Sequence, residues 1–185
     1  DTTPQVARID AHLLNRVGVT RLCYCGSVLH TRPSAPHATR EPIQFGAEIY
    51  GHLGEEADQE ILALALDCLH AAKVKSAHVD MADARIVKVM LAGLDLDMHT
   101  QSALHRALAS KDRAALDSLT KAFSKELRDG MLALTDLYGD ASVIDSAKAV
   151  LPDLPGVREA LSSLRRLAQA LPVNSVSFDL ADLGG

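Results

Sequence analysis

Two strand-like runs separated by a polar loop constrain the fold more than any other feature of this sequence. The run at 19–30, VTRLCYCGSVLH, is rich in β-branched and apolar residues, and the run at 43–51, IQFGAEIYG, alternates apolar and polar side chains. The loop between them, Thr31 to Pro42, holds three prolines and no hydrophobic period. The pattern predicts a hairpin whose second strand has one apolar and one polar face.

The polar face of the second strand is the first candidate site. Gln44 and Glu48 share this face roughly 13 Å apart at the usual strand rise, and Gly46 leaves a gap between them. An amide and a carboxylate flanking a gap would suit a ligand with an ammonium group, which Glu48 could pair with. The alternative is a polar strand face that only contacts solvent, and the pattern alone favours that plainer interpretation.

Helical periodicity dominates the rest of the chain. In TPQVARIDAHLLNR, one stripe carries Val6, Ile9, Leu13 and Leu14, with Thr2 or Thr3 as the cap and Gly18 as the end. Further helices are predicted at 55–72, 83–91, 98–109, 112–128, 130–138, 142–150 and 155–171, and strands in KSAHVDMA and VNSVSFDLADL. Residues 95–150 hold no strand candidate, so we interpret them as an inserted helical lobe.

Composition narrows the class of protein. The 185 residues are 48% hydrophobic, enough for one domain with a sizeable core, and the net charge of −5 argues against a nucleic-acid partner. Three cysteines imply no disulfide framework and suit a reducing cytoplasm, and no apolar run is long enough to span a membrane. Because the chain begins without Met and stops after a strand-like run, we expect N- and C-terminal parts of the full protein to be absent.

The other reactive side chains form no recognisable catalytic or metal set. Cys23 and Cys25 share a strand face without partners at ligand spacing, so they are predicted to be buried small hydrophobes. Arg32 and Arg40 could meet a phosphate, but an arginine on a loop is more often a plain surface residue. Asp179 and Asp182 are expected to be strand-face or strand-end groups. No phosphate-binding glycine motif is present, and we predict no cofactor.

A resemblance adds to this reading. The stretch RLCYCGSVLHTRPSAPHATREPIQFGAEIYG resembles motif 2 of class II aminoacyl-tRNA synthetases in its histidyl form, with a returning strand that ends in Q-x-G-x-E. The phrases DTTPQVARIDAHLLNR, SVLHTRP, REPIQFGAEIYGH and VSFDLADL resemble more closely still the synthetase-derived family of ATP phosphoribosyltransferase regulatory subunits. The resemblance implies an α+β fold, with a class II synthetase-like antiparallel sheet flanked by helices. Residues 1–185 would then be a partial core domain with a helical insertion at about 95–150.

The resemblance also implies a histidine pocket and a lost active site. Asp1, Thr3, Gln44 and Glu48 match the residues that meet the amino acid, the last two through its α-amino group. The arginine that clamps the ATP α-phosphate falls on His30, and a later arginine falls on Gly184. A histidine is shorter and mostly neutral at pH 7, and a glycine has no side chain, so adenylate formation should be lost.

The function implied is therefore regulatory and not catalytic. The resemblance implies a cytoplasmic subunit that joins the short-form catalytic subunit of ATP phosphoribosyltransferase in a hetero-oligomer. Neither a membrane nor a nucleic acid is expected as a partner. It would be needed for the first step of histidine biosynthesis and its feedback inhibition by L-histidine, and it would form a homodimer within the complex. Two alternatives stay open: a piece of an active histidyl-tRNA synthetase, and a stand-alone amino-acid-binding module.

Overall fold

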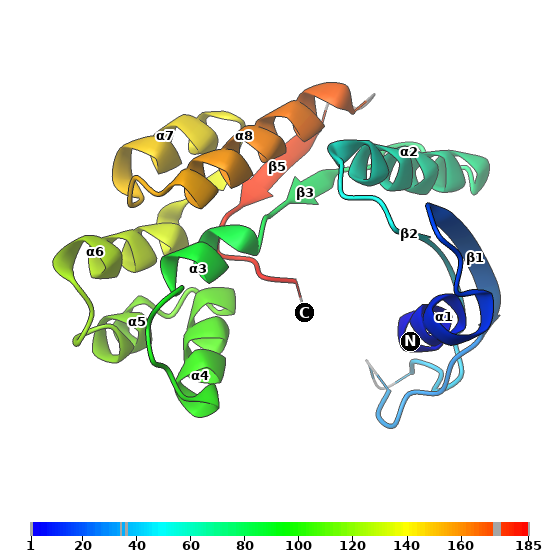
Figure 1. The fold of residues 1–185 in the computed structure, drawn as a ribbon, viewed down its shortest axis with the longest axis horizontal. Helices are drawn as coiled ribbons and strands as arrows, with labels where there is room; N and C mark the ends of the chain where they lie inside the picture. The colour runs from blue at the N-terminus through cyan, green and yellow to red at the C-terminus, as the bar shows by residue number, and fades with distance from the viewer. Residues whose placement is uncertain (1, 34, 36, 172–174, 185) are drawn as a thin grey trace. The chain divides into compact units, whose positions relative to one another are not determined.

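The computed structural model describes residues 2–33, 35, 37–171 and 175–184. The chain divides into two compact units, Asp1–Cys68 (unit 1) and Leu69–Gly185 (unit 2) (Figure 1). Helices and strands are mixed in both units, which confirms the expected α+β class. No helix of the described part of the chain is long and apolar enough to cross a membrane.

Unit 1 is built on the predicted hairpin. Strands β1 (Thr20–Ser27) and β2 (Ile43–Tyr50) pair antiparallel, so that Tyr24 faces Gly46 and Leu22 faces Glu48. Helix α2 (Glu55–Ala71) follows β2, and the Arg21 guanidinium of β1 donates to both carboxylate oxygens of Glu60 on α2, with the Nη2–Oε2 distance at 2.7 Å.

The N-terminal helix is shorter than predicted. It runs as α1 (Thr3–Arg8) and continues as the π-helical turn η1 (Ile9–Leu14). Asn15, with φ of 42°, ends it in the left-handed conformation, so the prediction that Gly18 ends the helix is wrong. Asparagine tolerates this conformation better than other non-glycine residues, which explains the earlier stop.

Unit 2 contains a small mixed sheet covered by helices. Strand β5 (Val176–Asp179) lies between β3 (Val79–Met81), which is parallel to it, and β4 (Tyr138–Gly139), which is antiparallel. The expectation of no strand between residues 95 and 150 is wrong at β4. Two residues are too few to show a period in the sequence, and only pairing with β5 makes them a strand.

Within the described residues of unit 2, six α-helices accompany the sheet, and most match the predicted ranges. They are α3 (Arg85–Met90), α4 (Met98–Ala109), α5 (Arg113–Leu119), α6 (Lys125–Ala133), α7 (Ser142–Val150) and α8 (Pro155–Ala170). The predicted single helix at 112–128 is wrong, because α5 stops at Leu119 and α6 starts anew at Lys125. The helix predicted at 130–138 is the end of α6 followed by the 3-10 turn η2 (Leu134–Asp136).

The hydrophobic core lies in unit 2. Fully buried side chains there include Ile86, Leu104, Leu108, Leu116, Met131, Leu134, Ile144, Leu161 and Phe178. In unit 1, Val6 is the one buried apolar side chain among the described residues, and Leu13 of the predicted stripe is 77% exposed. The apolar periodicity of unit 1 therefore does not correspond to a core within this part of the chain.

Candidate functional site

The polar face of β2 carries the candidate site. Gln44 and Glu48 are half-buried on this face, as the alternation predicted. The Gln44 side-chain oxygen Oε1 accepts two hydrogen bonds from Thr2, one from the backbone nitrogen at 3.0 Å and one from the hydroxyl at 3.2 Å. These bonds attach the start of α1 to β2. They also explain why Thr2, although it is the N-cap residue, makes no side-chain capping bond.

The two carboxylate oxygens of Glu48 differ in their hydrogen bonding. The Tyr50 hydroxyl donates to Glu48 Oε2, whereas Oε1 is buried and has no hydrogen-bond partner among the described residues. Desolvation, followed by the hydrogen bond to Glu48, raises the pKa of Tyr50 to about 12, so the phenol stays a proton donor. A buried carboxylate oxygen without a partner is costly unless a donor meets it. Within the described residues, Glu48 Oε1 is therefore open to a hydrogen-bond donor.

The gap expected at Gly46 is filled by an aromatic ring. A Cβ atom at Gly46 would lie 2.5 Å from both Cζ and the hydroxyl oxygen of Tyr24, its partner on β1. The same Tyr24 hydroxyl lies 3.4 Å from the Thr3 hydroxyl. The space between Gln44 and Glu48 is therefore bounded by a tyrosine ring, and the prediction of an empty gap there is wrong.

The predicted pocket residues come together only in part. Gln44 and Glu48 share the face, and Thr3 is exposed and reaches Tyr24 instead of the β2 pair. Asp1 lies outside the described residues. Sequence reasoning missed Tyr24 and Tyr50 as site residues, although Tyr50 is on the same face by alternation. Tyr24 could be placed only from the register of β1 against β2.

The two positions predicted to have lost arginines lie in different units. His30 is exposed in the hairpin loop, where its backbone nitrogen donates to Arg40 O at 2.8 Å and its carbonyl accepts from Arg40 Nε at 3.3 Å. Gly184 follows β5, has φ of 71°, and donates from its nitrogen to Asp182 Oδ1 at 3.0 Å. Arg40 therefore has a local backbone role beside His30.

The remaining candidate residues, Asp179, Cys23 and Cys25, do not form part of the candidate site. Asp179 at the end of β5 pairs with Lys111 at 2.8 Å, as expected of a strand-end group. Cys23 and Cys25 are exposed, so the prediction that they are buried is wrong. On the same strand face, Phe45 and Ile43 are 69% and 74% exposed, so the described residues leave this end of the face uncovered. The described residues contain no cluster of side chains that could hold a metal ion.

Comparison with known proteins identifies the family to which the chain belongs. The family model for histidyl-tRNA synthetase matches residues 1–185, so the chain belongs to the histidyl-tRNA synthetase family. Within it, the ATP phosphoribosyltransferase regulatory subunit of Acidovorax sp. (strain JS42) is 60% identical over 185 residues, covering 100% of this chain and 48% of that protein. The chain thus spans about half the length of the curated relatives it matches.

Solved structures agree on the fold. An ATP phosphoribosyltransferase regulatory subunit/histidyl-tRNA synthetase from Bacillus halodurans C has a TM-score of 0.80 at 25% identity, covering 99% of this chain and 49% of that chain. A chain of the ATP phosphoribosyl transferase (HisG:HisZ) complex from Thermotoga maritima has a TM-score of 0.64 at 17% identity. The match covers 98% of this chain and 64% of that chain. The synthetase-like fold expected from the sequence is confirmed.

Proposed function

We propose that the protein containing this chain is a non-catalytic regulatory subunit of ATP phosphoribosyltransferase. The observation that carries the proposal is the 60% identity to such a subunit over all 185 residues of the chain. The partner would be the short-form catalytic subunit, in a hetero-oligomer that catalyses the first step of histidine biosynthesis. A homodimer of the full-length protein within that assembly is part of the proposal.

The absence of synthetase chemistry supports a regulatory role. Where the synthetase resemblance calls for phosphate-clamping arginines, this chain has His30, exposed on a loop, and Gly184. Neither supplies a fixed positive charge to a developing phosphate transition state. We infer that the protein forms no adenylate.

The polar face of β2 supports an amino-acid pocket. Its buried Glu48 Oε1 has no partner within the described residues and is suited to the α-ammonium group of L-histidine. Gln44, fixed by Thr2, borders the same face. Feedback inhibition then follows by linkage, if L-histidine binds two states of the assembly with different affinities.

The pocket is tested by calorimetric titration of L-histidine into the full-length protein. We expect saturable binding that Glu48→Gln abolishes, because the substitution removes the charge but little volume. Glu41→Gln removes the same charge from an exposed loop residue and should leave the affinity unchanged. Absence of binding to the unsubstituted protein would contradict the pocket but not the regulatory role.

The regulatory role has its own test. The full-length protein is mixed with a short-form catalytic subunit, and formation of the phosphoribosyl-ATP product is measured with and without it. We expect product formation to depend on the mixture, and the full-length protein alone to show no ATP–pyrophosphate exchange with histidine. Clear exchange would instead indicate an active synthetase.

A further inference from the structure

Unit 2 contains a groove whose charged residues the proposed function does not use, although its lining includes Gly184. It lies between α3, α4 and residues 182–184, and its volume is about 810 Å³. Small-molecule sites typically measure roughly 300–1,000 Å³. Every lining residue belongs to unit 2, whereas the polar face of β2 belongs to unit 1.

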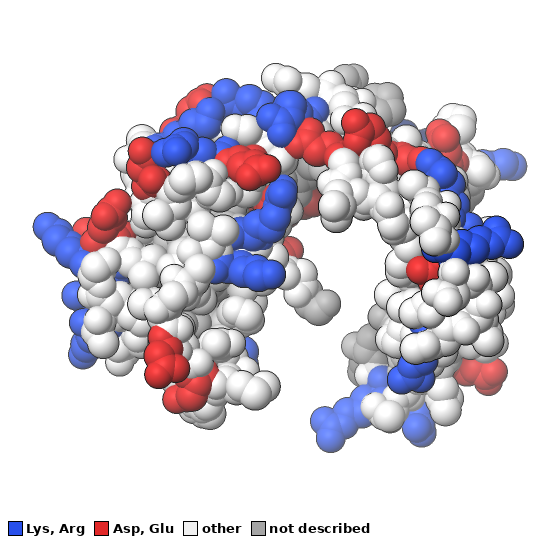
Figure 2. All heavy atoms as spheres, viewed as in Figure 1, with Lys and Arg blue, Asp and Glu red and all other residues white. Residues whose placement is uncertain are grey.

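The groove is lined by an excess of positive charge. Lys88 and Arg85 of α3 and Arg106 of α4 line it, together with His105, whereas Asp182 is its one acidic lining residue within the described chain. Figure 2 shows Lys and Arg side chains close to α3, while over α7 and α8 the two signs of charge are mixed. The electrostatic potential in the groove therefore favours an anion.

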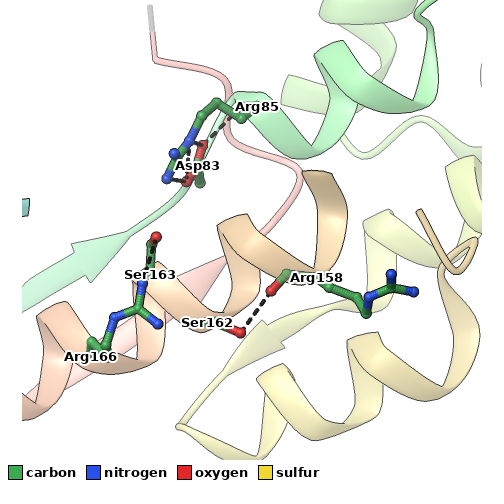
Figure 3. A network of polar contacts seen from close by, with 6 residues as sticks. All are labelled: Asp83, Arg85, Arg158, Ser162, Ser163 and Arg166. Atoms are coloured by element: carbon green, nitrogen blue, oxygen red, sulfur yellow. Dashed lines mark hydrogen bonds and ion pairs between the residues drawn. The ribbon is translucent and has the colours of Figure 1, made fainter. Parts of the chain in front are cut away.

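Two of these cations are available to a ligand. Arg85 is turned back onto Asp83, with Nη2 and Oδ2 2.6 Å apart (Figure 3). Lys88 and Arg106 are exposed and form no ion pair with any residue that the structure describes. The Asp182 carboxylate accepts from the backbone nitrogen of Gly184 and is not paired with either cation. Lys88 and Arg106 are thus not held by a direct ion pair within the described residues.

The floor of the groove is apolar. Val87 is 1% exposed, and the half-buried Leu91 follows it one turn later on the same side of α3. Close by, Lys111 pairs with Asp179 and lies 3.8 Å from the centroid of the Tyr138 ring, which ties the end of α4 to the sheet. A ligand with an anionic group at the rim and an organic body on the floor matches this lining.

We propose that the groove binds a phosphorylated small molecule, with Lys88 and Arg106 contacting its phosphate from two helices. Arginine and lysine are the side chains that proteins use for phosphate, arginine through a planar fork and lysine as a point charge. The shared chemistry is the phosphate group, and its source is either inorganic pyrophosphate or a nucleotide. The site would give the regulatory subunit a second ligand input besides an amino acid.

The proposal is tested by titrating pyrophosphate, ADP and adenosine separately into the full-length protein without its catalytic partner. We expect saturable binding of ADP or pyrophosphate, weakened by salt, and none of adenosine. Comparable pyrophosphate and ADP affinities would assign the site to the phosphates alone, and tighter ADP binding to a nucleotide. The measurement requires no catalytic activity, so its failure is distinct from failure of the proposed function.

Matched variants locate the binding. Lys88→Gln with Arg106→Gln should weaken binding about tenfold or more, as expected for loss of two charged hydrogen bonds. Lys121→Gln with Lys148→Gln removes the same charge from exposed positions outside the groove and should change the affinity little. Arg106→Lys keeps the positive charge, so it should lower the affinity for the phosphate ligand less than Arg106→Gln does. Equal affinities in the two double variants, no binding of either phosphate, or equal binding of adenosine and ADP would each overturn the proposal.

Discussion

At the scale of single residues, Gly46 is a position at which one added methyl group would collide with the candidate site. In Gly46→Ala, the Cβ would lie 2.5 Å from the Tyr24 ring, so the ring must move. Because the atoms that must move are the far end of a half-exposed side chain, we expect the free energy of unfolding of the full-length protein to fall by about 0.5–1.5 kcal/mol, the usual cost of a displaced rotamer, measured by urea denaturation. Gly26→Ala on β1 is the control, because its Cβ would meet nothing within 4 Å.

A second variant attributes the effect to the ring. If the collision is the cause, Tyr24→Ala should remove most of the additional cost of Gly46→Ala in a double-mutant cycle. Equal costs of Gly46→Ala with and without the Tyr24 ring would contradict this account.

Tyr50 makes the same site sensitive to alkaline pH. Its pKa is raised to about 12 from an ordinary value near 10, by desolvation first and then by the bond to Glu48. Because the folded pKa is the higher one, the stabilisation is fully present below about pH 10 and is lost as pH rises through about 12. In a spectrophotometric titration of phenolate, we expect a step near pH 12 that is absent in Tyr50→Phe. A titration curve that Tyr50→Phe leaves unchanged in this range would argue against the bond.

At the scale of elements, the break between α5 and α6 is a feature that the helical pattern of the sequence did not reveal. Ser124 is the N-cap of α6, and its hydroxyl accepts from Leu127 N at 3.3 Å. We expect Ser124→Ala to lower the free energy of unfolding by about 1 kcal/mol. In one continuous helix over 112–128 the same change would be neutral or stabilising, since alanine is the best helix former.

The control for that prediction lies within another helix. Ser102 is an exposed residue inside α4, and Ser102→Ala should have little effect or stabilise slightly. Thermal or urea unfolding of both variants in the full-length protein separates capping from helix propensity.

At the scale of the whole molecule, unit 1 exposes an apolar sheet face that we expect the full-length protein to cover. Ile43 and Phe45 are 74% and 69% exposed, and Cys25 is the cross-strand partner of Phe45. An isolated two-stranded hairpin is marginally stable in water. Since the matched relatives are about twice as long as this chain, we predict that chain outside residues 1–185 packs on this face.

Cysteine labelling of the folded full-length protein measures that cover. We expect Cys25 to react with a thiol reagent much more slowly in the folded protein than after denaturation in urea, as read by mass spectrometry of peptides. A Cys25 that reacts equally fast in both states would show that the face is open to solvent.

Local patterns in the sequence determined the elements that carry the site. Alternation with period two predicted β2 and the shared face of Gln44 and Glu48, and helical periodicity predicted α4, α7 and α8. These succeed because the period of apolar residues reflects which side of an element meets the core. The family resemblance supplied the fold class, which pattern alone left open.

Only the tertiary structure decided which atoms meet. The Tyr24 ring over Gly46 depends on strand register, the free oxygen of Glu48 depends on its bond to Tyr50, and β4 exists only through its pairing with β5. The same holds for the groove, which joins α3, α4 and residues 182–184, far apart along the chain. Local sequence specifies the preferred backbone dihedral angles and the side of a helix or strand on which each side chain lies. Contacts between distant segments depend on how the whole chain packs, and the spacing of apolar residues within one segment does not predict them.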